Sequence, residues 1–262
     1  MSRRMSVKLV VKAANIAIYR ILLRPMEWLV RRFSSVGQHP FFDSSEFAWI
    51  PRLEAGWTTI RDELRALLRE RGRIPNIQEI SPEQLSLTRD DKWKSYWLCA
   101  FGRKIADNCR RCPETARLIE AIPGMESAFF SILASGKHLP EHRGIYSGVL
   151  RYHLGLVVPA RKEVCRIRVD SEVAHWEEGR GFVFDDTYRH EVWNDTDEER
   201  VALIIDFARP LPFPLSVLNA AVNWMFGRSG YIQDIVENVQ EWNRQTGPGT
   251  TGPSVTARTS GS

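Results

Sequence analysis

The second half of the chain carries short segments rich in β-branched and aromatic residues, and this pattern constrains its fold more than any other feature. Turn residues separate the segments, and no helical pattern lies between them. They cover Ala128–Leu133, Gly148–Val158, Cys165–Val169, Gly181–Phe184 and Val201–Phe207. Within Cys165–Val169 apolar and basic residues alternate, so one face of that strand should be buried and the other wet. Strands that follow one another without helices predict an antiparallel assembly, and a barrel-like double sheet of the jelly-roll kind fits best.

The first half of the chain is predicted to be helical. From Ser44 to Arg71, large apolar residues recur at spacings of three and four, and Trp93–Cys109 and Pro113–Glu120 give two further helical patterns. Proline is well tolerated in the first turn of a helix, which suits Pro113. The predicted fold is therefore mainly β, with flanking helices on one side of the sheets.

Basic residues concentrate at the N-terminus. Residues 1–33 hold eight lysines and arginines against one acid, so they contribute +7 to a net charge of +4 and leave a slightly acidic body. Between Val7 and Leu23, apolar side chains fall at helical spacing with lysines on another face, which predicts an amphipathic helix. Pro25 is expected to break or kink this helix. It can lie on an anionic membrane surface, pack on its own domain, or pair with a second subunit in a homodimer.

These patterns divide the chain into four parts: a basic amphipathic arm at 1–39, the main domain at 40–210, an apolar helical segment at 211–245, and a tail at 246–262. The tail is rich in Gly, Pro, Ser and Thr and is expected to be disordered. The acidic body disfavours nucleic acid as a partner. We recognise no transmembrane stretch and no cleavable signal, so we expect a cytoplasmic protein whose arm allows a peripheral position on the inner face of the membrane.

Histidines and one arginine in the strand-rich half are candidates for a metal site. His142 lies in a loop before a long strand, His190 follows a strand, and Arg200 begins the next strand. Two histidines from separate strands near one end of a barrel can meet around a cation, and a guanidinium can clamp a dicarboxylate through paired hydrogen bonds. These residue types suggest a metal-dependent site without identifying it, because a lone histidine or arginine is usually an ordinary polar residue.

Three longer motifs resemble the aspartyl/asparaginyl β-hydroxylase family. They read RYHLGLVVP at Arg151–Pro159, WEEG at Trp176–Gly179 and FDDTYRHEVWND at Phe184–Asp195, and the similarity runs from about Pro40 to Pro210. The resemblance implies an oxygenase that depends on Fe(II), 2-oxoglutarate and dioxygen, built on a cupin-like double-stranded β-helix. Bacterial lipid A and ornithine lipid hydroxylases are relatives of this family.

The resemblance also implies a role for individual residues. His142 and His190 match the iron ligands, and Arg200 matches the arginine that binds the distal carboxylate of 2-oxoglutarate. Further positions of the cosubstrate pocket are matched by Ser131, Arg151 and His153.

One family position departs from the pattern of most related oxygenases. Those enzymes carry a carboxylate ligand two residues after the first histidine, where this chain has Gly144, as the animal peptide-hydroxylating members do. Water or another ligand would then have to complete the iron shell. Glu141, Asp185 and Asp186 lie nearby in the sequence, but we do not favour them as ligands.

Two substrate classes compete. Gly144 favours the β-carbon of an aspartyl- or asparaginyl-type residue in a peptide or small molecule, which is the preferred expectation, because the lipid A enzymes carry Asp at that position. The basic arm and the apolar segment Pro214–Phe226 favour the acyl chain of a membrane lipid instead. A third hypothesis, a non-catalytic binding module on the same fold, would predict eroded ligand positions, and only Gly144 departs from the pattern.

Overall fold

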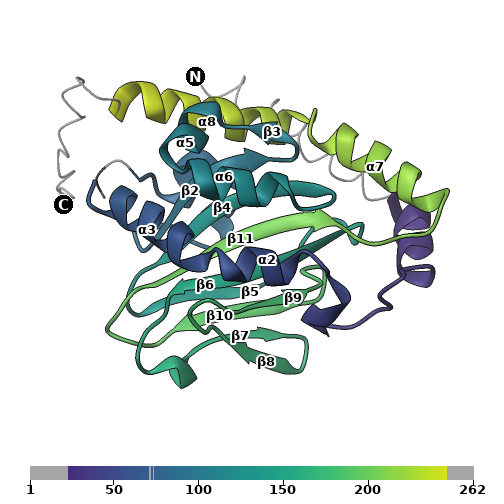
Figure 1. Cartoon of the computed structure of the whole chain (residues 1–262), viewed down its shortest axis with the longest axis horizontal. Helices are drawn as coiled ribbons and strands as arrows, with labels where there is room; N and C mark the ends of the chain where they lie inside the picture. The colour runs from purple at the N-terminus through teal and green to yellow at the C-terminus, as the bar shows by residue number, and fades with distance from the viewer. Residues whose placement is uncertain (1–22, 71, 73, 247–262) are drawn as a thin grey trace, which may run out of the picture.

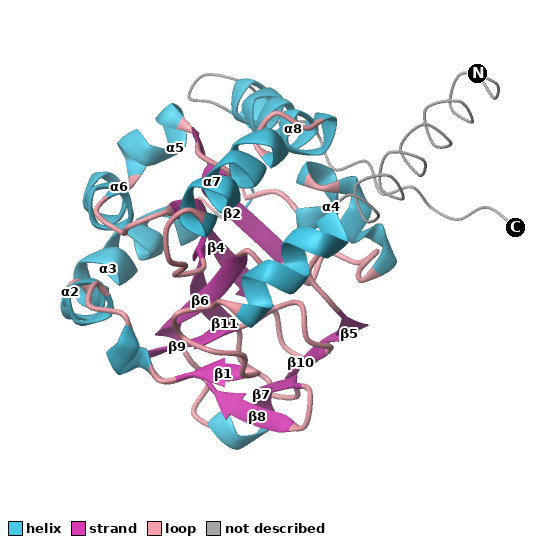
Figure 2. Cartoon of the chain, turned by 90° about the vertical axis from the view of Figure 1, so that its right-hand side faces the viewer, coloured by secondary structure: helices cyan, strands magenta, loops and turns pink. Residues whose placement is uncertain are grey.

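Two antiparallel sheets face each other in the computed structural model, which describes residues 23–70, 72 and 74–246. Figure 1 shows the helices gathered over one side of the larger sheet, and Figure 2 shows the smaller sheet below it. The larger sheet has the order β1 (Phe41–Phe42), β9 (Gly181–Phe184), β6 (Val149–Val157), β11 (Arg200–Ala208), β4 (Met125–Leu133), β2 (Trp93–Ala100) and β3 (Arg103–Lys104). The smaller sheet has the order β5 (Lys137–His142), β10 (His190–Asn194), β7 (Cys165–Val169) and β8 (Glu172–His175). The predicted jelly-roll core is confirmed.

The helices follow the chain in three groups. The first group precedes β2 and comprises a helical stretch at 23–32, η1 (Ser44–Glu46), α2 (Ile50–Ala55), α3 (Trp57–Leu68), α4 (Ile77–Ile80) and η3 (Pro82–Ser86). The second group lies among the strands. It comprises α5 (Ala106–Arg111) and α6 (Pro113–Glu120), which separate β3 from β4 in the sequence, and the single turn η4 (Lys162–Val164) between β6 and β7. The third closes the described chain with α7 (Leu215–Phe226) and α8 (Gly230–Thr246).

Alternation along the strands gives the larger sheet two chemically different faces. In β11, Val201, Leu203, Ile205 and Phe207 join the apolar core formed with α2, α3 and α6. The residues between them face the smaller sheet, because successive side chains of a strand point to opposite sides. Arg200 is the first of these inward-facing residues. The inner face is therefore where polar side chains collect.

Register identifies the other polar residues on that inner face. Across β11, Ala202 pairs with Ser131 of β4, Ile204 pairs with His153 of β6, and Asp206 pairs with Arg151 of β6. Residues directly opposite each other share a face. The larger sheet thus turns Ser131, Arg151, His153 and Arg200 toward the smaller sheet.

Most sequence-predicted elements are present. The five predicted strands correspond to β4, β6, β7, β9 and β11, and Pro113–Glu120 is the helix α6. In β7 the expected alternation is also present, with Cys165, Ile167 and Val169 buried between two half-buried arginines. The long helical pattern Ser44–Arg71 is divided into η1, α2 and α3, and Gly56 separates the last two because Leu118 packs against its backbone.

The helix predicted for Trp93–Cys109 is wrong in its first half. Residues Trp93–Ala100 form β2, a two-residue turn at Phe101 and Gly102 follows, and only Ala106–Arg111 is helical. Both turn residues have positive φ, which a tight hairpin of this kind requires. Because β2 is buried on both faces, its apolar residues are nearly continuous, and such a run fits a helical spacing by coincidence.

The N-terminal and C-terminal parts meet on one side of the molecule. Residues 23–32 are helical and include Pro25, and Leu23 and Val30 pack with Val222 of α7. The predicted amphipathic helix from Val7 lies outside the described residues, except for its last residue, Leu23. The predicted tail also lies outside them after Thr246. Among the described helices, none has the length and apolar character to cross a bilayer.

Candidate active site

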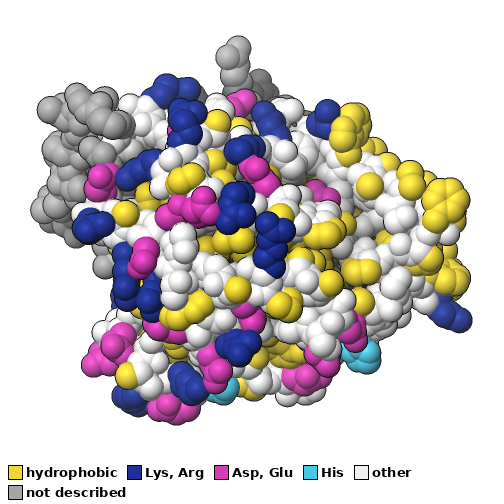
Figure 3. Space-filling view, viewed as in Figure 1, with side chains coloured by type: hydrophobic (Ala, Val, Ile, Leu, Met, Phe, Trp, Pro, Cys, Tyr) yellow, Lys and Arg dark blue, Asp and Glu magenta, His cyan; other side chains and the backbone are white. Residues whose placement is uncertain are grey.

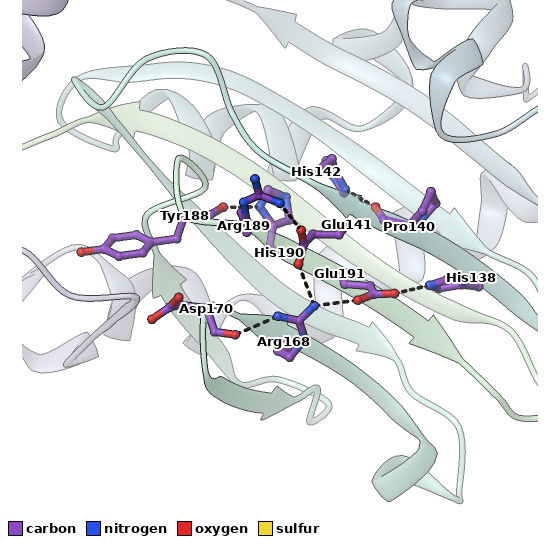
Figure 4. Close-up of polar contacts among 10 residues, drawn as sticks. All are labelled: His138, Pro140, Glu141, His142, Arg168, Asp170, Tyr188, Arg189, His190 and Glu191. Carbon is purple, nitrogen blue, oxygen red and sulfur yellow. Dashed lines mark hydrogen bonds and ion pairs between the residues drawn. The ribbon is translucent and has the colours of Figure 1, made fainter.

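His142 and His190 meet on the inner face of the smaller sheet. His142 is the last residue of β5 and His190 is the first of β10, and the two are direct partners across the antiparallel pair. Their ring centroids are 4.1 Å apart (Figure 4). The structure thus brings together the two histidines that the sequence singled out.

A bulge in β5 turns His142 inward. Val192 pairs with Leu139 and His190 pairs with His142, so three steps along β5 match two steps along β10. Without the extra residue His142 would share the face opposite to Leu139, which is buried. Pro140 lies in the bulge, and an edge strand such as β5 accommodates a proline there.

Both rings are held in the same tautomer. Nδ1 of His142 donates to the carbonyl of Pro140 at 2.8 Å, and Nδ1 of His190 donates to the carbonyl of Tyr188 at 3.1 Å (Figure 4). A carbonyl only accepts, so each Nδ1 carries the proton and each Nε2 keeps a lone pair. Burial lowers the pKa of both rings, that of His190 to about 3, with the His142 ring as a further cause. A neutral imidazole with a free Nε2 lone pair can bind a divalent metal, and both rings meet this requirement.

Charged residues on the outer face of the smaller sheet tie the strands together behind the histidines. Glu191 accepts from Arg168 and from His138 at 2.7 Å, and Glu141 binds Arg168 and Arg189 (Figure 4). Exposed pairs contribute little energy one by one, but this network links β5, β10 and β7. It supports the register that places the two histidines opposite each other.

The carboxylates near the histidines are all paired with arginines. Glu141 binds two of them on the outer face, Asp185 forms a fully buried ion pair with Arg209, and Asp186 lies 3.4 Å from Arg151. In the described part of the chain, no group of three or more His, Cys, Asp or Glu side chains is arranged to hold a metal ion. The metal-binding potential of this region therefore rests on the two imidazoles.

Asp186 fills the space beside Gly144. A Cβ at position 144 would overlap the Asp186 carboxylate, and the Gly144 amide donates to the Asp186 carbonyl at 2.6 Å. Burial raises the pKa of Asp186 to about 6, against the lowering effect of Arg151. Position 144 cannot carry the carboxylate of most related oxygenases unless Asp186 moves.

Aromatic rings connect the histidine pair to Arg200. Phe184 contacts His190 at 5.7 Å between ring centroids and His153 at 5.0 Å. His153 in turn stacks on Trp176 at 5.9 Å, and the Arg200 guanidinium lies 4.4 Å from the centre of the Trp176 ring. The sequence analysis assigned no role to Phe184 or Trp176, although both belong to the quoted motifs.

Arg200 is a buried cation with no carboxylate partner among the described residues. It is 1% exposed, and within the described chain its guanidinium makes one long hydrogen bond, of 3.3 Å to the Ser131 carbonyl, and no ion pair. Burial lowers its pKa to about 10. Its Nε, both ring nitrogens of His153 and Nε1 of Trp176 are buried without hydrogen-bond partners in the described chain. Buried polar atoms are normally satisfied, so a polar, anionic ligand would supply the partners that this cluster lacks.

The two remaining predicted residues lie at the edge of this cluster. Ser131 Oγ accepts from Trp93 Nε1 at 3.0 Å, which leaves the hydroxyl proton free to be donated. Arg151 binds Asp206 through two hydrogen bonds of 2.7 and 3.0 Å and also faces Asp186. Arg151 is therefore already neutralised by carboxylates, unlike Arg200. Sequence reasoning missed Asp206, although its spacing of six from Arg200 puts both on one strand face.

Comparisons with known proteins agree with this geometry. The sequence profile of the aspartyl/asparaginyl beta-hydroxylase family matches residues 54–210. An ornithine lipid ester-linked acyl 2-hydroxylase from Rhizobium tropici is 38% identical over 232 residues, which are 87% of this chain and 83% of that protein. The human aspartyl/asparaginyl beta-hydroxylase is 34% identical over 166 residues, which are 62% of this chain but only 21% of that protein.

Solved cupin structures also align with parts of the chain. A cupin domain of an XRE-family transcriptional regulator from Enterobacter cloacae covers 44% of this chain and 96% of that one, at 13% identity and a TM-score of 0.30. A cupin domain protein from Salinispora arenicola covers 53% and 92%, with the same identity and TM-score. The family match extends over more than half of the sequence and includes every predicted site residue. The chain therefore belongs to the aspartyl/asparaginyl β-hydroxylase family.

Proposed function

We propose that this chain is an Fe(II)- and 2-oxoglutarate-dependent dioxygenase that hydroxylates the acyl chain of a membrane lipid. The observation that carries the oxygenase assignment is the buried, carboxylate-free Arg200, set beside unpartnered His153 and linked by aromatic rings to the His142–His190 pair. An imidazole pair at one end and a lone guanidinium at the other suit a ligand that binds a metal and carries a distal carboxylate.

The residues present fit the two implied groups. The free Nε2 atoms of His142 and His190 would hold Fe(II), and Arg200 would bind the distal carboxylate of 2-oxoglutarate through a paired hydrogen bond. When bound, these groups and dioxygen supply the chemistry that converts a C–H bond to C–OH while 2-oxoglutarate becomes succinate and carbon dioxide.

The protein's own contribution is positioning and exclusion of water. An incoming carboxylate would neutralise the Arg200 charge and accept hydrogen bonds from the Arg200 guanidinium and from the protonated ring nitrogen of His153. Trp176 and Phe184 are fully buried and flank His153, so they keep water away from this region. The low-dielectric surroundings strengthen each of these contacts.

The choice of a lipid rests on the relative that aligns over most of its own length, the Rhizobium tropici ornithine lipid acyl 2-hydroxylase. This reverses the preference drawn from Gly144, because the peptide-hydroxylating relatives share only a fraction of their length with this chain. Hydroxylation of an aspartyl-type residue in a peptide or small molecule stays the second candidate, favoured by Gly144. A lipid substrate suits a peripheral position on the inner face of the membrane.

Mass spectrometry of lipids and peptides separates the two candidates. In one experiment, extracts from cells with and without the gene are searched for lipids and peptides that are one oxygen atom heavier. In the other, the purified chain is incubated with Fe(II), 2-oxoglutarate and either ornithine lipid or an aspartate-containing peptide, and the products are searched in the same way. We expect the added oxygen on a lipid acyl chain. Oxygen found only on the peptide would overturn the lipid assignment and retain the oxygenase assignment.

A further inference from the structure

Helix α7 exposes most of its large apolar residues and buries its two asparagines. Asn219 and Asn223 lie on the buried side, whereas the opposite side carries Val217, Leu218, Trp224 and Met225. We call these four residues, together with Phe213 just before the helix, the α7 face; Phe213 is 83% exposed and Trp224 is 59% exposed. A water-exposed helix normally has the reverse arrangement. Figure 3 shows apolar side chains gathered along this edge of the molecule.

Hydrogen bonds of the two buried asparagines explain why α7 turns its apolar side to the solvent. Asn219 accepts from the Tyr146 hydroxyl at 2.8 Å and donates to the Gly148 carbonyl at 2.8 Å. Asn223 donates to Glu126 at 2.8 Å. Specific hydrogen bonds therefore fix the orientation of α7, and the exposure of its apolar side is built into the fold.

Basic residues border the α7 face. Arg228 lies in the turn after α7, and its guanidinium is 3.6 Å from the centre of the Trp224 ring. Arg228 and Arg103 line an open cavity of about 490 Å³ beside Trp224, and neither forms an ion pair with a described residue. The helix at 23–32 packs on α7 through Val222 and adds exposed Arg24 and Arg32.

The composition of the surrounding surface extends this pattern. Two exposed aromatic side chains, Trp28 and Phe33, belong to the N-terminal segment that packs on α7. In residues 23–33, the described part of that segment, Arg24, Arg31 and Arg32 stand against one acid, Glu27. Apolar and aromatic side chains rimmed by arginines are the signature of a helix that lies in the interface of an anionic bilayer.

We propose that the α7 face, with the helix at 23–32, is a docking surface for an anionic membrane. A second copy of the chain is a poorer occupant, because a two-fold interface would place this positively charged patch against the same patch of the other copy. A bilayer accepts the apolar face, offers its headgroups to the arginines, and leaves no like charges opposed. The proposal agrees with the lipid substrate but rests on the surface alone.

The surface is connected to the histidine site. Tyr146, which Asn219 of α7 holds, lies four residues after His142, and Ile145 between them is 56% exposed. Docking would therefore bring the segment after His142, which lies under the buried side of α7, close to the membrane.

Co-sedimentation of the full chain with vesicles tests the proposal. Phosphatidylcholine vesicles with and without phosphatidylglycerol are compared for the wild type, for the variant Leu218→Gln/Trp224→Gln/Met225→Gln, and for Arg32→Gln/Arg228→Gln. Val173→Gln on β8 is the matched control, since Val173 is a 52% exposed apolar residue of the smaller sheet, away from α7 in the sequence. All substituted side chains are exposed, and circular dichroism checks that each variant is folded.

We expect the wild type and Val173→Gln to bind the anionic vesicles, and the α7-face variant to lose at least about tenfold in partition coefficient, since three side chains no longer enter the bilayer. The arginine variant should lose about fivefold per arginine at low salt. Equal binding by the wild type and the α7-face variant would overturn the proposal. The proposal would also be overturned if the wild type were a dimer that does not bind vesicles and the α7-face variant were a monomer. Neither result depends on catalysis, so failure here leaves the oxygenase assignment to its own test.

Discussion

His142 and His190 repeat the same local geometry on neighbouring strands. Each ring donates its Nδ1 proton to the backbone carbonyl two residues earlier, and the two ring centroids lie 4.1 Å apart. The repetition orients both Nε2 atoms without help from another side chain. A metal bound there would be held by two imidazoles whose tautomers the backbone fixes.

Loss of either imidazole should abolish metal binding. We expect His142→Ala and His190→Ala to weaken Fe(II) affinity by more than about 100-fold, because one ring alone cannot replace a fixed pair. Equilibrium dialysis under anaerobic conditions measures this affinity. His175→Ala, which removes an exposed histidine of β8, is the control and should bind as the wild type does. Wild-type affinity in His190→Ala would contradict the metal-site assignment.

Replacement of Arg200 should separate function from stability. A buried guanidinium whose pKa is lowered to about 10 makes the folded state less stable at every pH below that value, because folding disfavours its charged form. We expect Arg200→Met to keep or raise the stability of the ligand-free protein, by up to about 2 kcal/mol. The same change should raise the KM for 2-oxoglutarate by at least about 100-fold, and Arg200→Lys should recover only part of it. An unchanged KM would reject the role of Arg200.

Arg209 is the matched comparison for Arg200. It is equally buried, but it forms an ion pair with Asp185. Removing one partner leaves an uncompensated buried charge, so Arg209→Met should destabilise the protein by about 3–5 kcal/mol. Urea unfolding of the two methionine variants measures both effects. Similar losses in the two variants would mean that Arg200 has a structural partner after all.

A side chain at position 144 should not be tolerated. In Gly144→Ala the new methyl group overlaps the Asp186 carboxylate, which is buried and held by Arg151. We expect a loss of about 1–3 kcal/mol in stability, typical of overpacking, together with reduced turnover. Gly230→Ala is the control, since that position has open space, and it should be neutral in thermal unfolding. A fully stable and active Gly144→Ala would show that Asp186 moves freely.

Glu126 should make stability depend on pH. Burial, followed by the nearby Asp206 charge, raises its pKa to about 6, while a hydrogen bond from Asn223 opposes the shift. A raised carboxyl pKa means that the folded state binds the proton more tightly, so stability falls as pH rises from about 4.5 to 6 and stays lower above that range. Glu126→Gln should therefore gain about 1 kcal/mol at pH 7, after allowance for partial exposure, and nothing near pH 4. Equal gains at both pH values would assign the effect to another cause.

The sequence predicted the larger sheet better than the smaller one. The strands β4, β6, β9 and β11 are long or strongly apolar, so their patterns are visible without the structure. In the smaller sheet only β7 was predicted. Its neighbours β5, β8 and β10 are short and carry charged side chains outward, and the bulge in β5 interrupts the alternation that would have revealed a strand.

His142, His190 and Arg200 were candidates from their residue types and positions, and the family motifs gave them roles and added Ser131, Arg151 and His153, but the environment of these residues was not predictable. Nothing in the sequence shows that Arg151 is neutralised by Asp186 and Asp206 while Arg200 has no described carboxylate partner. That difference arises from register between strands distant in sequence. Strand β2 was predicted as a helix because its burial on both faces depends on contacts with residues distant in sequence, which no local pattern shows.

Succinate formation from 2-oxoglutarate tests the central claim most directly. The purified full chain is supplied with Fe(II), dioxygen and ornithine lipid, and the wild type is compared with His190→Ala and with the control His175→Ala. We predict that the wild type and His175→Ala form succinate in step with lipid bearing one added oxygen, and that His190→Ala forms neither. Succinate release by His190→Ala at the wild-type rate, or oxygen transfer to lipid without consumption of 2-oxoglutarate, would contradict the account.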